Sequence, residues 1–177
     1  MTDIRPATAD DLPRIEEIYD AIHTAEETGA ASVGWARGVY PTRATAQAAL
    51  DDGALFVLTD GGVLVAAGRI DRTQVPVYAQ VPWQYAAPPE QVLVLHTLVV
   101  DPAAAGHGYG TQFVRFYAQR ARALGCTVLR IDTNAKNTTA RRLYARLGFR
   151  EAAIVPCTFN GIAGVALACL EKRLDAE

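Results

Sequence analysis

Apolar positions along the chain follow two periods, and together they predict alternating strands and helices. Near the N-terminus they recur every three or four residues, which is typical of an amphipathic helix. These positions are Leu12, Ile15, Ile18, Tyr19 and Ile22. A strand is expected before this helix at residues 4–7, a second helix at 43–50, and a β-hairpin at 55–70 whose turn holds Asp60, Gly61 and Gly62.

The second half of the chain repeats this alternation with stronger signals. The run VLVLHTLVV predicts a strand over 92–100, and a glycine-rich loop follows it. The remaining expected elements are a helix over 109–124, a strand over 127–133, a helix over 138–147 ended by Gly148, and strands over 149–155 and 164–174. An Asn160-Gly161 turn is expected between these last two strands.

One long segment, residues 74–91, has no clear period. It contains Pro76, Pro82, Pro88 and Pro89 together with Tyr78, Trp83 and Tyr85. Loops of this length are either functional or disordered, and the aromatic side chains favour an ordered loop.

Composition limits the classes of protein that fit. The 177 residues are 50% hydrophobic, with 17 basic and 19 acidic side chains, so we expect one domain spanning residues 1–177 and no nucleic-acid partner. The three cysteines lack metal-ligand spacing, and no signal peptide or membrane span is visible. We therefore expect a cytoplasmic protein without a metal or a membrane partner, and a homodimer is the assembly to test.

The glycine loop between residues 105 and 111 allows several interpretations. A nucleotide-triphosphatase loop requires a Lys-Ser/Thr pair after the last glycine, and Gly110 is followed instead by Thr111 and Gln112. A dinucleotide-binding loop is favoured by Asp132 at the end of the next strand, but its third glycine falls one position early. A tight structural turn without a ligand is the third interpretation.

Two residue patterns decide between these interpretations. The first is Ala105-x-x-Gly108-x-Gly110. The second has the specified positions Asn137, Ala140, Leu143, Tyr144, Gly148 and Phe149. Together with the order of elements, they resemble the GNAT superfamily of acyl-CoA-dependent N-acyltransferases, although that family has Arg or Gln where this chain has Ala105. The resemblance implies a single-domain α/β fold with a mixed, mostly antiparallel sheet flanked by helices, whose splayed central strands bind acyl-CoA.

The same resemblance implies which residues bind acetyl-CoA. Backbone amides at the start of a helix are suited to bind its diphosphate, and a strand edge is suited to pair with its pantetheine arm. The diphosphate residues would be Gly106, His107, Gly108, Tyr109, Gly110 and Thr111. The pantetheine residues would be Leu98, Val99 and Val100, with Asn137 at the cofactor end.

Acyl transfer to an amine also needs a base and an acid. The resemblance places a general base at His96, on the strand that enters the loop, with Glu90 and Asp132 as weaker candidates. Tyr144 is the candidate general acid because a phenol is protonated at cellular pH. A hydrogen-bonded structural histidine and an ordinary core tyrosine are the alternatives.

The function implied is transfer of an acetyl group from acetyl-CoA to a primary amine of a small molecule. Aromatic residues of two loops and one turn are expected to shape the acceptor pocket, namely Trp35, Tyr40, Trp83, Tyr85, Phe159 and Asn160. The alternatives are acetylation of a protein N-terminus or lysine, and an acyl-CoA-binding module without turnover.

Overall fold

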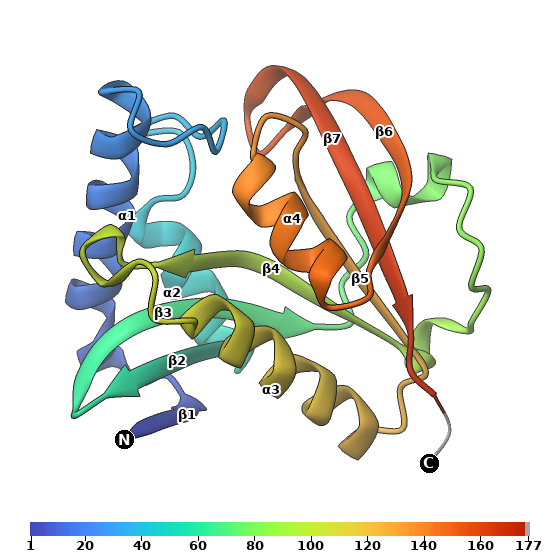
Figure 1. Ribbon diagram of the computed structural model, residues 1–177, viewed down its shortest axis with the longest axis horizontal. Coiled ribbons are helices and arrows are strands. Elements are labelled where there is room, and N and C mark those ends of the chain that lie inside the picture. The colour runs from blue at the N-terminus through green and yellow to red at the C-terminus, as the bar shows by residue number, and fades with distance from the viewer. Residues whose placement is uncertain (176–177) are drawn as a thin grey trace.

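A seven-stranded sheet in the order β1-β2-β3-β4-β5-β7-β6 forms the centre of the protein, seen in a computed structural model that describes residues 1–175 (Figure 1). Only β4 and β5 run parallel; every other neighbouring pair is antiparallel. The strands are β1 (Thr2–Pro6), β2 (Leu55–Asp60), β3 (Val63–Asp71), β4 (Val92–Val100), β5 (Val128–Asn134), β6 (Arg150–Phe159) and β7 (Ile162–Arg173).

Four helices cover the two faces of this sheet. They are α1 (Leu12–Glu27), α2 (Arg43–Asp51), α3 (Tyr109–Ala123) and α4 (Thr138–Arg146). Because side chains alternate along a strand, Phe56 and Leu58 of β2 pack with α3, whereas Leu55 and Val57 pack with α1 and α2. In Figure 1, α3 lies in front of the sheet and α2 behind it. The predicted fold class, a mixed and mostly antiparallel sheet flanked by helices, is confirmed.

The central strands β4 and β5 separate halfway along their length. Their parallel pairing ends at Leu95 and Ile131, whereas β5 stays paired with β7 as far as Asn134. On its other edge β4 carries an irregularity, since β3 pairs Ala67 with Val99 but Arg69 with His96. Thr97 lies in this bulge with a φ of 51°, a conformation that β-branched residues rarely adopt. The splayed central strands are therefore confirmed.

The long segment 74–91 is ordered, as predicted. Glu171 of β7 is fully buried, and its carboxylate accepts hydrogen bonds from the backbone N–H groups of Gln84 (2.8 Å) and Tyr85 (3.2 Å). The Arg130 guanidinium lies over the Trp83 ring, 4.3 Å from its centroid. These contacts fix the segment against β5 and β7.

The β6–β7 connection is shorter than predicted. Residues 156–163 were expected to separate the two strands, but pairing continues to Phe159 and Ile162, so Asn160 and Gly161 form a two-residue turn. Both have positive φ, 51° and 77°, as such hairpin turns require. The hairpin therefore projects beyond the sheet, beside the gap between β4 and β5.

Candidate active site

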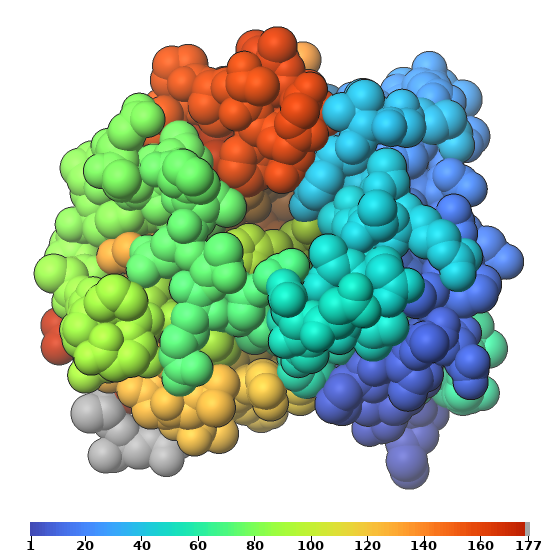
Figure 2. Space-filling view, turned by 180° about the vertical axis from the view of Figure 1, so that it is seen from behind, coloured from blue at the N-terminus to red at the C-terminus, as the bar shows by residue number. Residues whose placement is uncertain are grey.

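A cavity of about 610 Å³ lies where β4 and β5 separate. Its walls come from the end of α1 and the connection after it, the second half of β4, the C-terminal end of β5, the first turn of α3, helix α4, and the β6–β7 hairpin. Figure 2 shows the surface hollowed between this hairpin, in red, and the connection after α1, in light blue. Gly34 makes that connection possible, because a Cβ there would stand 2.2 Å from the Asn134 Nδ2 atom.

The glycine loop presents unused backbone donors at the start of α3. Among residues 1–175, none of the backbone N–H groups of residues 106–111 is hydrogen-bonded to the protein. Gly106 and Gly108 have φ of 84° and 76°, with open space where a Cβ would be. Gly110 lies in the cavity wall, where a Cβ would be 3.2 Å from Leu143 Cδ2. Such donors at a helix N-terminus favour an anion.

The expected acyl-CoA residues fall into two groups. Leu98, Val99, Val100, Gly110 and Asn137 all line the cavity. The others do not line it and lie beside it, in the loop before α3 or in the first turn of that helix, namely Gly106, His107, Gly108, Tyr109 and Thr111.

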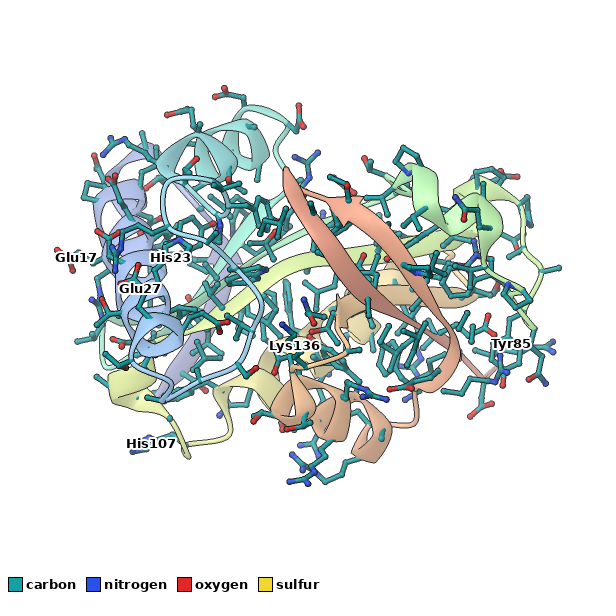
Figure 3. The ribbon with its side chains drawn as sticks, turned by 90° about the horizontal axis from the view of Figure 1, so that it is seen from above. Glu17, His23, Glu27, Tyr85, His107 and Lys136 are labelled. Carbon is teal, nitrogen blue, oxygen red and sulfur yellow. The ribbon has the colours of Figure 1, made fainter. Side chains whose placement is uncertain are left out.

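Two side chains of the loop point away from the unused amides. The His107 ring stacks on Tyr109 and its Nδ1 atom lies 3.1 Å from the Ala104 carbonyl oxygen, which leaves the side chain at the edge of the molecule (Figure 3). The Tyr109 hydroxyl donates to Asp60 at 2.7 Å. The Tyr109 hydroxyl is therefore already engaged, and the backbone N–H groups of both residues remain available to a ligand.

Tyr144 lies on α4 with its ring against Phe149, and it lines the cavity. Its side chain is buried, and its hydroxyl has no hydrogen-bond partner in the part of the chain that the structure describes. Burial, and secondarily the negative charge of Asp132, raise the pKa of Tyr144 well above its usual value. The phenol is therefore protonated at neutral pH.

His96 faces a second, smaller cavity of about 270 Å³ rather than the one that holds Tyr144. Three residues line both cavities, Tyr40, Thr97 and Asn160, and the Tyr40 hydroxyl is hydrogen-bonded to Thr97 at the boundary. The His96 Nε2 atom lies 3.0 Å from Asp71 Oδ1. The two predicted catalytic side chains are thus in adjacent cavities.

Asp71 connects His96 to a larger network of charges. Burial acts to raise the pKa of Asp71, but hydrogen bonds from His96, from Arg69 and from the Thr73 backbone outweigh burial and hold the pKa well below its usual value. Arg69 Nε donates to Asp71 at 2.5 Å, and Arg69 Nη2 donates to Asp52 at 2.7 Å. Asp71 therefore stays ionised and fixes the His96 ring.

Of the two weaker base candidates, only Asp132 belongs to the site. It lines the large cavity, and its Oδ2 atom accepts a hydrogen bond from the Tyr78 hydroxyl at 2.7 Å. Burial raises the pKa of Asp132, and the Tyr78 hydrogen bond opposes this. Glu90 is exposed and lines neither cavity. It lies in the turn Pro89–Gln91, which precedes the N-terminal end of β4, whereas the large cavity is lined by the C-terminal half of that strand.

Only four of the six expected acceptor residues lie in the same cavity. Trp35, Tyr40, Phe159 and Asn160 line the large cavity. Trp83 and Tyr85 do not, because Trp83 packs on Arg130 and the backbone of Tyr85 is bound to Glu171. Tyr78 contacts the site through Asp132 instead, which sequence reasoning missed. Its position four residues before Pro82 gave no sign of that contact.

Over residues 1–175 no group of three or more His, Cys, Asp or Glu side chains is arranged to hold a metal ion. No helix in the same range combines the length and the apolar character needed to cross a membrane.

Comparisons with known proteins agree with this geometry. The match to the N-acetyltransferase YycN of Bacillus subtilis is 33% identical over 75 residues, which is 41% of this chain and about half, 48%, of that curated relative. A GNAT-family acetyltransferase structure from Streptococcus agalactiae has a TM-score of 0.83 at 21% identity, covering 99% of this chain and 96% of that one. The structure of yncA from Salmonella typhimurium with its cofactor acetyl-CoA has a TM-score of 0.67 at 23% identity, covering 99% and 95%.

The family assignment rests on a longer match. The model of the acetyltransferase (GNAT) family matches residues 13–149, which include both sequence patterns, the splayed strands and the helices that flank the cavity. This confirms the resemblance seen in the sequence. The chain therefore belongs to the acetyltransferase (GNAT) family.

Proposed function

We propose that this GNAT protein transfers an acetyl group from acetyl-CoA to a primary amine of a small molecule by direct attack. The observation that carries the proposal is the continuity of the site. The unused amides of residues 106–111 adjoin the cavity wall at Gly110, and Tyr144 lines the same cavity. A ligand with a diphosphate at one end and a thioester at the other fits this arrangement.

What we call the cofactor side comprises the cavity walls from residues 97–100 and 137–144 together with the adjoining loop 105–111. The amides of residues 106–111 would bind the diphosphate, with support from the positive end of the α3 dipole. Beyond Leu95 the edge of β4 has no partner on β5, so Leu98, Val99 and Val100 would pair with the pantetheine arm as an added strand. The Asn137 side chain caps α4 by accepting from Ala140 N–H at 3.1 Å, which would place it at the cofactor end.

The proposed acetyl transfer then proceeds through attack of the amine, loss of the thiolate and the proton transfers that accompany them. An acceptor ammonium loses one proton to a base, and the free amine attacks the thioester carbon, forming the C–N bond. Collapse breaks the C–S bond, and the Tyr144 phenol donates a proton to the departing thiolate. The amide nitrogen then passes its extra proton to the Tyr144 phenolate, which restores the phenol, and the protonated base releases its proton to solvent. Burial weakens Tyr144 as an acid, but the same poorly solvated cavity makes the thiolate more basic.

His96 is the proposed base. Its ring is fixed by Asp71 at 3.0 Å, as in other His-carboxylate pairs. The shared boundary at Thr97 and Tyr40 gives a proton a short route from the large cavity to this ring. An ordinary alkyl ammonium needs about 4–5 kcal/mol to become a free amine at pH 7, so a base at this position has a substantial effect on the rate.

The test measures release of CoA by the purified protein with acetyl-CoA and a broad panel of amines. We expect turnover, a fall in kcat of about 100-fold in Tyr144→Phe with unchanged affinity for acetyl-CoA, and no change in the control Tyr85→Phe. Binding of acetyl-CoA without CoA release from any amine would identify a non-catalytic module instead. Turnover with peptides alone would identify a protein acetyltransferase.

A further inference from the structure

We propose that Asp132 binds the acceptor as an ammonium ion, and that the acceptor is a monoamine with an apolar body and no carboxylate beside the amine. This inference rests on the proposed function, because it assigns the substrate class of the same site. Asp132 has no role in the acyl-transfer steps themselves.

Charge distribution in the large cavity is the first argument. Among the described residues that line it, Asp132 is the only carboxylate and Lys136 the only lysine or arginine. Lys136 precedes α4 on the cofactor side, and its side chain is exposed; Figure 3 shows it beside the start of that helix. The opposite part of the cavity therefore offers a negative charge and no positive one.

The position of Asp132 is the second argument. It is the first residue of β5 beyond the last position paired with β4. Ile131 packs into the core on the α3 side, so the alternation along the strand directs Asp132 to the other face. The carboxylate therefore lies where β4 and β5 separate, on the face of the sheet opposite α4 and Tyr144. From this face an acceptor would approach a thioester that lies between the two strands.

The carboxylate is also held in place with one oxygen free. Tyr78 donates to Oδ2 at 2.7 Å, and the Tyr78 ring packs edge-on against Trp83 with centroids 5.2 Å apart. Within residues 1–175, Oδ1 accepts no hydrogen bond. A half-buried carboxylate with one free oxygen is stabilised by a cation.

The walls around Asp132 on this acceptor side are apolar and aromatic. They comprise Trp35, Tyr40, Phe159, Ile162, Val165 and Leu167. The Trp35 and Tyr40 rings meet edge to face, with centroids 5.8 Å apart and an interplanar angle of 84°. Aromatic faces attract a cation and also bury a hydrocarbon body. These walls fit an ammonium group attached to an apolar skeleton.

A carboxylate next to the amine would be unfavourable here. Two arginines lie on this face, and neither lines the large cavity. Arg130, two residues before Asp132 on β5, is buried against the Trp83 ring and donates to Gln74 and to the Tyr85 carbonyl. Arg69 lines the smaller cavity and is already bonded to Asp71 and Asp52. A substrate carboxylate would therefore lose water without gaining a positive partner, and it would lie close to Asp132. Amino acids are thus expected to be poor acceptors.

The test uses three ligands that share a phenyl ring and is independent of turnover. Benzylamine is charged at pH 7, phenylhydrazine has nearly the same shape but is uncharged, and phenylglycine adds a carboxylate to benzylamine. Binding is measured by calorimetry in the presence of CoA, which carries no acetyl group. We expect benzylamine to bind at least about 100-fold more tightly than phenylglycine.

The variant Asp132→Asn keeps the shape and an acceptor for Tyr78. We expect it to weaken benzylamine about 100-fold and phenylhydrazine less than about threefold, with CoA affinity unchanged. The exposed control Asp3→Asn, in β1, should behave as the parent protein. The proposal is overturned if Asp132→Asn retains benzylamine affinity, if phenylglycine binds as tightly as benzylamine, or if benzylamine does not bind. Asp132-dependent binding without CoA release from acetyl-CoA would contradict the proposed function alone.

Discussion

The cofactor side and the acceptor side of the central cavity are built in different ways. The cofactor side comes from three segments within residues 97–144, and the groups proposed to face the ligand are backbone amides of residues 106–111 and the open edge of β4. The acceptor side is assembled from side chains of four separate segments, represented by Trp35, Tyr78, Asp132 and Phe159.

This difference explains how one fold can keep its cofactor and change its acceptor. Backbone amides require only that the chain follow a certain path, so the loss of an Arg or Gln at Ala105 removes no donor from residues 106–111. Each acceptor-side wall, in contrast, depends on one side chain that a single substitution can replace. We expect substitutions on the first side to act through the backbone, and substitutions on the second through charge and shape.

The strongest test of this contrast is Gly108→Val. A valine at a φ of 76° is strained, and its side chain would enter the space that the diphosphate needs. Loss of two charge-assisted hydrogen bonds amounts to about 4 kcal/mol, so acetyl-CoA affinity should fall about 1000-fold. Equilibrium binding of acetyl-CoA measures the effect.

The matched control is Gly125→Val. Gly125 has a φ of 73° and open space around its Cβ position, but it ends α3 at the opposite end from the loop. Both variants should lose similar stability, about 1–2 kcal/mol, and only Gly108→Val should lose acetyl-CoA. Equal loss of binding in both would show that the effect comes from backbone strain alone.

The same contrast decides what the sequence could predict. The cofactor side follows from local signals, because the strand 92–100, the glycines and the Asn137-to-Phe149 pattern lie close together in the chain. Asp132 and Tyr78 are separated by 54 positions, and no spacing rule joins them. The bulge at Thr97 was equally invisible, since a threonine in an apolar run gives no sign of a φ of 51°.

A second prediction concerns the base on the acceptor side. His96→Gln should lower kcat/KM for alkyl amines about 100-fold, because the ammonium then has no base. Affinity for acetyl-CoA should not change, since the cofactor side contains no part of the His96–Asp71 pair. Steady-state kinetics with benzylamine, which must lose a proton, and phenylhydrazine, which is already uncharged, distinguishes a base role of His96 from a structural role. An equal loss with the uncharged nucleophile would contradict a base role.

A third prediction compares two tryptophans. Trp35→Ala should raise KM for the acceptor about tenfold through lost aromatic contact, and it should also lower the free energy of unfolding because Trp35 packs against the core and Tyr40. Trp83→Ala should leave the acceptor KM unchanged and lower the free energy of unfolding, because Trp83 packs on Arg130 outside the cavity. Acceptor kinetics and urea denaturation of both variants distinguish these outcomes. A raised acceptor KM in Trp83→Ala alone would reverse the assignment of the two side chains.

The smallest expected effect is the pH dependence of the acceptor side. The pKa of Asp71 is held below its usual value by His96 and Arg69 against the effect of burial. A carboxyl whose folded-state pKa is lowered contributes stability that is complete above its unfolded pKa of about 3.9 and is lost as pH falls through the folded pKa. Asp71→Asn should therefore be about 1–2 kcal/mol less stable at pH 6.

That difference should shrink as the pH falls below about 4, since protonation removes the same charge from the parent protein. Urea denaturation of both proteins from pH 6 to pH 3 measures it. Acetyl-CoA affinity should not differ between them at any pH in this range, because the amides of residues 106–111 do not titrate. A stability difference that grows on acidification would mean that Asp71 destabilises the fold as an ion, and the His96 ring would then lack its fixed partner.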